Sequence, residues 1–207
     1  MPLVRKPGSA SPPAVQDVRL VQQALASPVS EERWAAARAA ADLAGADMAL
    51  SQALRAESDP RVREAIFTSL ARIGSPVAIE SLLSMLRSDT AVLRTQALDA
   101  LRMVRTLGAV PSQLLRDPDP DVRILSCELV RSLPAPEANQ LLCELLATEK
   151  NANVCAAAVD VLAEVGEPKV LGTLADCARR FSDTPFLVFA IGAVSDRINL
   201  KSASARD

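Results

Sequence analysis

The sequence predicts an all-α fold, a right-handed α-solenoid of about five helix pairs with a terminal half-repeat at each end. Three observations lead to this prediction. An Asp-Pro-x-Val-Arg motif recurs with a period of about 31 residues, apolar residues follow each motif at helical spacing, and glycine or proline separates successive stretches. No stretch alternates between apolar and polar residues over a length that would indicate a strand.

The repeat is clearest in a series of arginines, one at the start of each alanine-rich amphipathic stretch: Arg33, Arg63, Arg94 and Arg123. The segments 59–63 and 119–123 match the motif well, and the segment 89–94 is a looser copy with one inserted residue. In the later copies, after residue 150, the arginine is missing.

Each period contains two helices, and the apolar stripes predict their positions. One helix at 15–26 precedes the pairs; first helices are expected at 30–44, 60–73, 91–106, 120–132, 152–165 and 185–197, and second helices at 47–56, 76–87, 110–116, 136–147 and 168–180. The expected N-caps, each followed by proline at the first helical position, are Asp59, Ser75, Asp119 and Thr184. Left-handed C-caps are expected at Gly45, Gly74, Gly108 and Gly166.

The domain organisation follows from where the repeats lie. We expect a single repeat domain over 15–198, a disordered proline-rich arm over 1–14 and a disordered polar tail over 199–207. The N-terminus has no apolar stretch typical of a signal peptide, and no apolar stretch is long enough to cross a bilayer. These features predict a cytoplasmic protein that does not bind membranes.

Composition argues against catalysis. The chain has no histidine, so it lacks Ser-His and Cys-His nucleophile pairs and imidazole metal ligands. It also lacks the phosphate-binding and nucleophile motifs that glycine-rich loops provide. Its four cysteines form no CxxC pair and are expected to be reduced, small apolar residues. A net charge of −2 argues against a nucleic-acid partner. We therefore expect no catalytic residues, no metal and no cofactor.

The Asp-Pro-x-Val-Arg opening, the period of about 30 residues and the Gly74-Ser75-Pro76 break between helices resemble HEAT-like repeats of the bacterial type shared with phycobilisome lyases. The resemblance covers about 27–198, with the better copies at 59–87 and 117–146. It implies a curved solenoid that binds other macromolecules, usually proteins. Because one scaffold hosts unrelated activities, the resemblance is specific for fold and weak for function.

The leading functional prediction is a non-catalytic scaffold or adaptor that binds partner proteins, with bacterial signalling or complex assembly as possible settings. The alternative is a phycobilin lyase-like or chaperone subunit that acts on a tetrapyrrole-bearing protein. The identity of the partner and the oligomeric state stay open at this point.

The second helices are expected to line the concave face in HEAT-type stacks, which places the candidate partner-binding residues on their outward sides. These are Arg55, Glu80, Ser84, Arg87, Gln113, Arg116, Glu137, Gln140, Glu144, Lys169 and Thr173. The set is polar and of mixed charge, which suits a protein or peptide better than a small apolar ligand.

The series Arg33, Arg63, Arg94 and Arg123 is expected to stack into a structural ladder, since neighbouring helices pack closely. Asp59, Asp89 and Asp119 are its expected hydrogen-bond acceptors, each near the start of a neighbouring helix. The alternative is a cationic strip that binds phosphate or an acidic peptide.

Aromatic residues are few. Trp34 is the one tryptophan, and it occupies a position where the next two copies have Glu64 and Thr95. A large aromatic residue at a polar position is a candidate anchor for a partner. The alternative is that the N-terminal arm or the helix at 15–26 covers it. Phenylalanines cluster in the last repeat, where they are expected to close the core: Phe181, Phe186 and Phe189.

Overall fold

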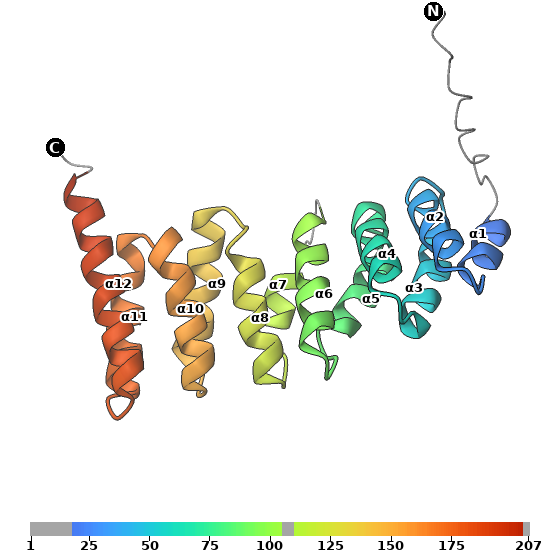
Figure 1. Cartoon of the computed structure of the whole chain (residues 1–207). Coiled ribbons are helices and arrows are strands. Elements are labelled where there is room, and N and C mark those ends of the chain that lie inside the picture. Colours follow the sequence, from blue (N-terminus) through green and yellow to red (C-terminus); the bar gives the residue numbers. More distant parts are fainter. Residues whose placement is uncertain (1–17, 105–109, 205–207) are drawn as a thin grey trace, which may run out of the picture. The chain divides into compact units, whose positions relative to one another are not determined.

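A computed structural model of the chain describes residues 18–104 and 110–204, and these residues are helical except for short connections (Figure 1). The chain forms two compact units, residues 1–81 and 82–207, and each is described by itself. The described residues contain no strand. The all-α solenoid class, built from successive helix pairs, is confirmed.

The helices lie close to their expected positions. Unit 1 contains α1 (Val18–Leu25), α2 (Ser30–Ala40), α3 (Asp47–Ala56) and α4 (Pro60–Ile73), together with most of α5 (Pro76–Met85). Unit 2 contains α6 (Ala91–Met103), α7 (Val110–Leu114), α8 (Pro120–Val130), α9 (Ala135–Thr148), α10 (Ala152–Val165), η1 (Pro168–Val170), α11 (Leu171–Arg180) and α12 (Pro185–Ser204). The bounds of α3, α4 and α10 match the prediction residue for residue.

Each unit has two layers of helices. In unit 1, the first helices α2 and α4 pack against each other, as do the second helices α1 and α3. In unit 2, α8 packs against α6 and α10, α10 packs against α12, and α9 packs against α11. The apolar stripes of the two layers meet between them, as in Ile66 and Leu70 of α4, which have no exposed surface. A pair therefore buries its apolar side only with its neighbours' help.

Local caps explain why several helices begin and end where they do. The Asp59 carboxylate accepts hydrogen bonds from the backbone N–H groups of Arg61 (2.8 Å) and Val62 (3.3 Å) at the start of α4. Asp119 caps α8, and the Ser75 hydroxyl accepts from the Ala78 N–H at 3.1 Å. Gly74 has φ of 59°, as the left-handed C-cap prediction requires, and Gly45 has φ of 81°.

The prediction of a left-handed C-cap was wrong at Gly166. Its φ is −63° and its backbone is extended. Glycine is needed here for space, because a Cβ would lie 2.3 Å from the Leu162 carbonyl oxygen and 2.8 Å from Ile198 Cδ1. The fourth expected cap, Gly108, lies outside the described residues.

The last helix also differs from the prediction. α12 continues to Ser204, so residues 199–204 are helical where a disordered tail was expected. Its buried stripe consists of Leu187, Ile191, Val194 and Ile198. Phe186 (53% exposed) and Phe189 (80% exposed) lie outside this stripe, so they do not close the core. Phe181 is half-buried against the core of unit 2. The expected arm, 1–14, lies outside the described residues.

Candidate partner-binding surfaces

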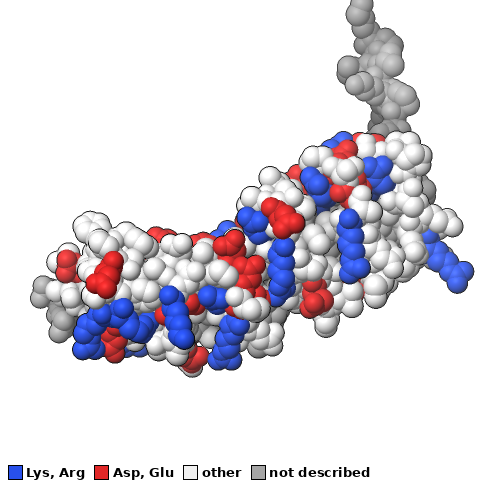
Figure 2. All heavy atoms as spheres, turned by 90° about the horizontal axis from the view of Figure 1, so that it is seen from below, with Lys and Arg blue, Asp and Glu red and all other residues white. Residues whose placement is uncertain are grey.

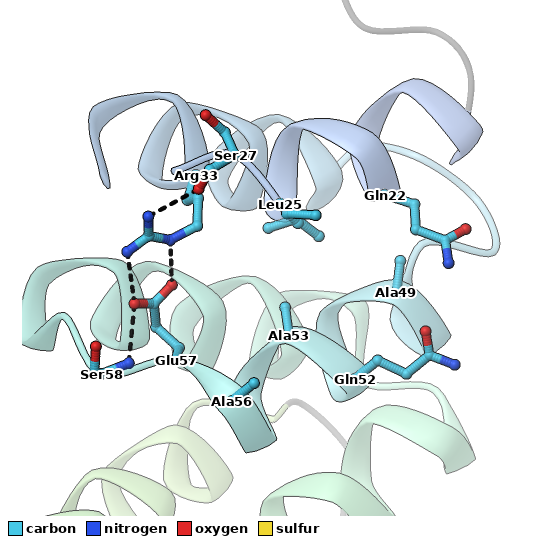
Figure 3. A pocket seen from close by; sticks show the side chains of 11 residues that line it. Gln22, Leu25, Ser27, Arg33, Ala49, Gln52, Ala53, Ala56, Glu57 and Ser58 are labelled. Carbon is cyan, nitrogen blue, oxygen red and sulfur yellow. Dashed lines mark hydrogen bonds and ion pairs between the residues drawn. The ribbon is translucent and has the colours of Figure 1, made fainter. Parts of the chain in front are cut away.

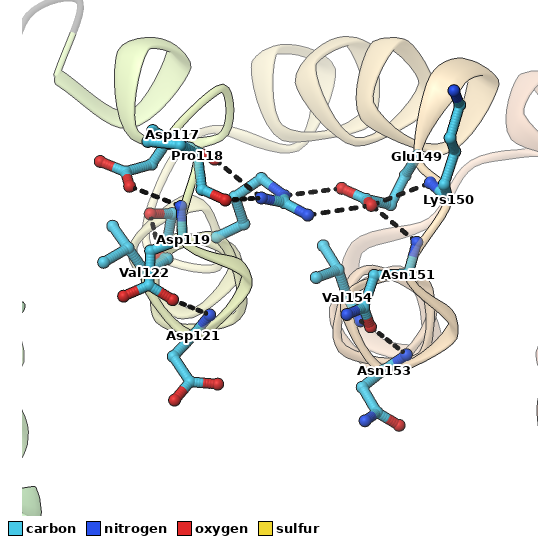
Figure 4. A network of polar contacts seen from close by, with 12 residues as sticks. Asp117, Pro118, Asp119, Asp121, Val122, Glu149, Lys150, Asn151, Asn153 and Val154 are labelled. Carbon is cyan, nitrogen blue, oxygen red and sulfur yellow. Dashed lines mark hydrogen bonds and ion pairs between the residues drawn. The ribbon is translucent and has the colours of Figure 1, made fainter.

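Two arginines of the ladder, Arg33 and Arg123, each form a largely buried clamp with a glutamate, and Figure 4 shows the one in unit 2. Arg123 Nε and Nη2 donate to the two carboxylate oxygens of Glu149 at 2.7 and 3.1 Å, and Nη1 donates to the Asp117 carbonyl at 2.8 Å. Glu149 also accepts from the backbone N–H groups of Lys150 (2.9 Å) and Asn151 (2.8 Å). Asn151 in turn caps α10. One carboxylate thus ties α8 to the connection that begins the next repeat.

Unit 1 repeats this arrangement. Arg33 Nε and Nη2 donate to Glu57 at 2.7 and 2.9 Å, and Glu57 accepts from the N–H groups of Ser58 (3.0 Å) and Asp59 (2.8 Å) (Figure 3). The hydrogen bond from Arg33 is the main cause that lowers the pKa of Glu57 below its usual value, against the opposing effect of burial. The geometry favours the structural interpretation of these arginines.

The expected acceptors of the ladder were wrong for Arg33 and Arg123. Asp59 and Asp119 are committed to capping the helices that they precede, and each clamp uses an acid at the C-cap of the second helix of its own pair, Glu57 after α3 or Glu149 after α9. These acids lie two residues before an N-cap, a spacing that the sequence shows and that could have identified them.

The two middle arginines lack such a clamp. Arg94 donates from Nη1 to the Ser88 carbonyl at 2.7 Å. Arg63 has a buried Nε with no hydrogen-bond partner among the described residues. In the repeat of Arg63, Ser88 occupies the position that Glu57 and Glu149 hold in theirs, so the sequence places no acid there. In the repeat of Arg94 the same position is Asp117, which pairs with Arg87 instead. The ladder is therefore complete at Arg33 and Arg123 only.

The predicted partner-binding residues lie on second helices or directly after them, except Lys169, which lies in η1 before α11. All are exposed except Thr173, which is half-buried. Some of them pair with acids: Arg87 with the buried Asp117, Arg116 with Glu144 at 3.8 Å, and Lys169 with Glu167 at 2.9 Å. In Figure 2, which shows one face of each unit, basic and acidic side chains are interspersed. Their exposure agrees with the predicted pattern, and their role in binding stays a prediction.

A groove of about 460 Å³ in unit 2 brings several of these residues together. It lies between the second helices α7 and α9, and its floor includes the apolar side chains of Leu115, Leu141 and Leu145. Arg116 and Glu144 lie at its edge, where both side chains are at least half exposed. The groove combines an apolar floor with a rim of both charges, which is the composition of many protein-binding sites.

Unit 1 has a groove of about 390 Å³ in the matching layer, between α1 and α3 (Figure 3). Its floor includes Leu25 and Ala53, and the amides of Gln22 and Gln52 lie at the end away from the clamp of Arg33 and Glu57. The amides can donate to and accept from a peptide backbone. Gln22 is not among the residues predicted from the sequence, because the helix at 15–26 is expected there to precede the helix pairs and has no place among the second helices.

Trp34 lies in the other layer of unit 1, on the first helix α2. It is half-buried, with the guanidinium carbon of Arg38 4.8 Å and that of Arg61 4.2 Å from the ring centroid. A groove of about 370 Å³ surrounds it, lined by α2 and α4. Because residues 1–17 lie outside the described part of the chain, covering by the arm is not tested.

None of the described helices combines the length and apolar character that crossing a membrane requires. Within the described residues, no three histidine, cysteine, aspartate or glutamate side chains converge as a metal site would need.

The comparison with protein families agrees with this architecture. The HEAT repeats family matches residues 18–102 and 109–185. Among solved structures, the archaeal HEAT-like repeats protein from Thermococcus onnurineus NA1 is similar, at 16% identity and a TM-score of 0.48, over 88% of this chain and 87% of that one. An engineered protein is 19% identical with a TM-score of 0.43, over 91% and 98% of the two chains.

The complex of CpcE and CpcF of phycocyanin lyase from Nostoc sp. PCC7120 is 17% identical with a TM-score of 0.41, over 95% of this chain and 100% of that one. Likeness at these identities concerns the fold alone. No curated protein matches the chain significantly. The family match spans most of the sequence and agrees with the motif, the helix pairs and the layers, so the chain belongs to the family of HEAT repeat proteins.

Proposed function

We propose that the chain is a non-catalytic scaffold that binds a partner protein on its second-helix layer. The groove between α7 and α9 is the observation that carries this proposal. Its leucine floor can receive apolar side chains of a partner, and the exposed pair of Arg116 and Glu144 can exchange its weak contact for contacts with the partner. The groove between α1 and α3 supplies a second surface of similar size in the same layer of unit 1.

Capture from native lysate on the immobilised full-length chain, followed by mass spectrometry, tests the proposal. We expect Arg116→Glu to reduce capture of the partner strongly, because the new carboxylate faces Glu144 and repels the acidic groups that Arg116 would attract. Arg197→Glu on the first helix α12 is the matched control, since Arg197 is also exposed, and it is expected to keep capture.

The two variants separate the outcomes. Loss of capture in the control but not in Arg116→Glu places the contact on the first-helix layer and contradicts the proposal. The alternative is a lyase-like role on a tetrapyrrole-bearing protein. It rests on the type of repeat, and no feature of the described residues supports it specifically. A change in visible absorbance after mixing the chain with a bilin would favour it.

A further inference from the structure

We propose that unit 1 carries a second, independent binding surface on its first-helix layer, a groove that binds an extended peptide bearing several carboxylate side chains. The Trp34 groove, as it is named here, lies between α2 and α4 and is defined by Trp34, Arg38, Arg61, Glu64 and Arg72. All of its lining belongs to unit 1.

Trp34 holds two guanidinium groups in place. Arg38 and Arg61 lie over its ring at 4.8 and 4.2 Å from the centroid. A guanidinium group that stacks on an aromatic ring uses its flat face, so the N–H donors around its edge stay available for a carboxylate. Stacking also restricts two long side chains before any ligand arrives, which lowers the entropy lost on binding. Trp34 is thus a positioning residue for two cations.

The three arginines are available to a ligand at low cost. Arg38 has no acid partner among the described residues, and its guanidinium group lies over the Trp34 ring. Arg61 pairs with Glu31, and Arg72 pairs with Asp42. All four side chains of these two pairs are more than half exposed. Exposed ion pairs contribute little to stability, so a ligand carboxylate can replace either acid.

The size of the groove suits a short extended segment. Arg61 and Arg72 mark its two ends on α4, and a helical rise of 1.5 Å per residue separates them by about 16 Å. An extended peptide of about five residues spans the same length. Between the ends, the lining includes the small side chains of Ala41 and Ala65, which let a peptide backbone approach the helices.

The acids in and around the groove favour a peptide over a nucleic acid. Glu64 is the one carboxylate of the lining, while Glu31 and Asp42 stand beside the end arginines. A nucleic-acid backbone carries a charge at every phosphate and would meet these carboxylates. A peptide can place an uncharged residue opposite Glu64 and its own carboxylates opposite the arginines.

The native fluorescence of Trp34, the one tryptophan of the chain, reports binding directly. The probe is an acetylated and amidated octapeptide in which glutamate alternates with serine, titrated into the full-length chain at low salt. We expect a saturable change in emission that weakens as salt is added. The same peptide with glutamine in place of glutamate is expected to give none. No change up to about 1 mM peptide would overturn the proposal.

Two exposed side chains provide opposite tests. Arg38→Gln removes the unpaired cation and is expected to weaken peptide binding about tenfold or more. Glu64→Gln removes the acid of the lining and is expected to tighten binding, a result that misfolding would not produce. Arg197→Gln replaces an exposed arginine on the first helix α12 of unit 2 and is the matched control, which is expected to change nothing. An unaffected Arg38→Gln, a weakened Glu64→Gln, or tighter binding of an oligothymidylate of equal charge would each contradict the proposal.

Discussion

Arg123 and Glu149 form a bidentate ion pair whose Nε–Oε2 and Nη2–Oε1 distances are 2.7 and 3.1 Å. The Arg123 side chain is 15% exposed and that of Glu149 is 6% exposed, so both groups are held largely away from water. Arg116 and Glu144, by contrast, are 3.8 Å apart and both at least half exposed. The first pair is suited to fix the register between repeats, whereas the second is free to rearrange.

Replacing Glu149 with glutamine tests the structural role of the clamp. Glu149→Gln keeps the shape of the side chain but leaves the Arg123 guanidinium without a counter-charge. We expect it to lower the free energy of unfolding by about 1–3 kcal/mol, the usual cost of a charged hydrogen bond left half made. Urea unfolding measures the change. Glu144→Gln on the exposed pair is the control, and an equal loss there would contradict a special role for the clamp.

The two clamps also predict a dependence of stability on pH. The hydrogen bond from Arg33 lowers the pKa of Glu57; for Glu149, burial raises the pKa, but hydrogen bonds from Arg123 and two backbone N–H groups outweigh it. A lowered folded-state pKa means that the stabilisation is complete above the ordinary value of 4.5 and is lost as pH falls through the lowered one. The stability gap between wild type and Glu57→Gln/Glu149→Gln should therefore shrink below about pH 4.5. A constant gap down to about pH 3 would show that these carboxylates do not titrate as argued.

Helix positions could be predicted from the sequence because they depend on local signals. Asp59 followed by Pro60 caps α4 within one turn, and Gly74 ends it with a positive φ, so its bounds follow from neighbouring residues alone. The second-helix residues were expected to be exposed for a similar reason, since each lies opposite an apolar stripe.

The contacts of the candidate sites depend on distant residues and were harder to predict. The sequence offers Arg33 two nearby acids as a partner, Glu57 and Asp59. Arg33 pairs with Glu57 because the Asp59 carboxylate caps α4. Trp34 was recognised as unusual for its position, but its two flanking guanidinium groups come from its own helix and from the next repeat. Both could have been found by aligning the repeats, because Arg38 lies one turn after Trp34 and Arg61 aligns with Glu31.

The incomplete ladder predicts unequal effects at Arg63 and Arg123. Arg123→Met would leave the buried Glu149 without its partner and is expected to lower the free energy of unfolding by about 2–4 kcal/mol. Arg63→Met removes a buried Nε that has no hydrogen-bond partner among the described residues, so we expect little change or a gain. Thermal or urea unfolding of both variants makes the comparison. A larger loss at Arg63 would show that its guanidinium has an essential contact.

Gly166 and Gly172 form a matched pair for the role of space at the end of α10. An alanine Cβ at Gly166 would clash with the Leu162 carbonyl oxygen, and relief requires a backbone shift, so Gly166→Ala is expected to cost about 1–3 kcal/mol. An alanine Cβ at Gly172 in α11 meets nothing within 4 Å, and Gly172→Ala is expected to stabilise the helix by about 0.5–1 kcal/mol. Urea unfolding of both variants measures the two changes, which are expected to have opposite signs. An unchanged stability of Gly166→Ala would mean that the backbone after α10 shifts at little energetic cost.

The four cysteines differ in access, which predicts the order in which they react with a thiol reagent. Cys143 is half-buried, whereas Cys127, Cys155 and Cys177 are fully buried and none forms a disulfide. Burial raises the pKa of Cys127 to about 12, and a hydrogen bond from Cys155 lowers the pKa of Cys177, but the Cys177 side chain has no exposed surface. Because reaction needs both a thiolate and access, one fast equivalent is expected in the native chain and four in denaturant. Cys143→Ser should remove the fast equivalent; a fast reaction that survives this substitution would mean that the core around α10 and α11 opens readily.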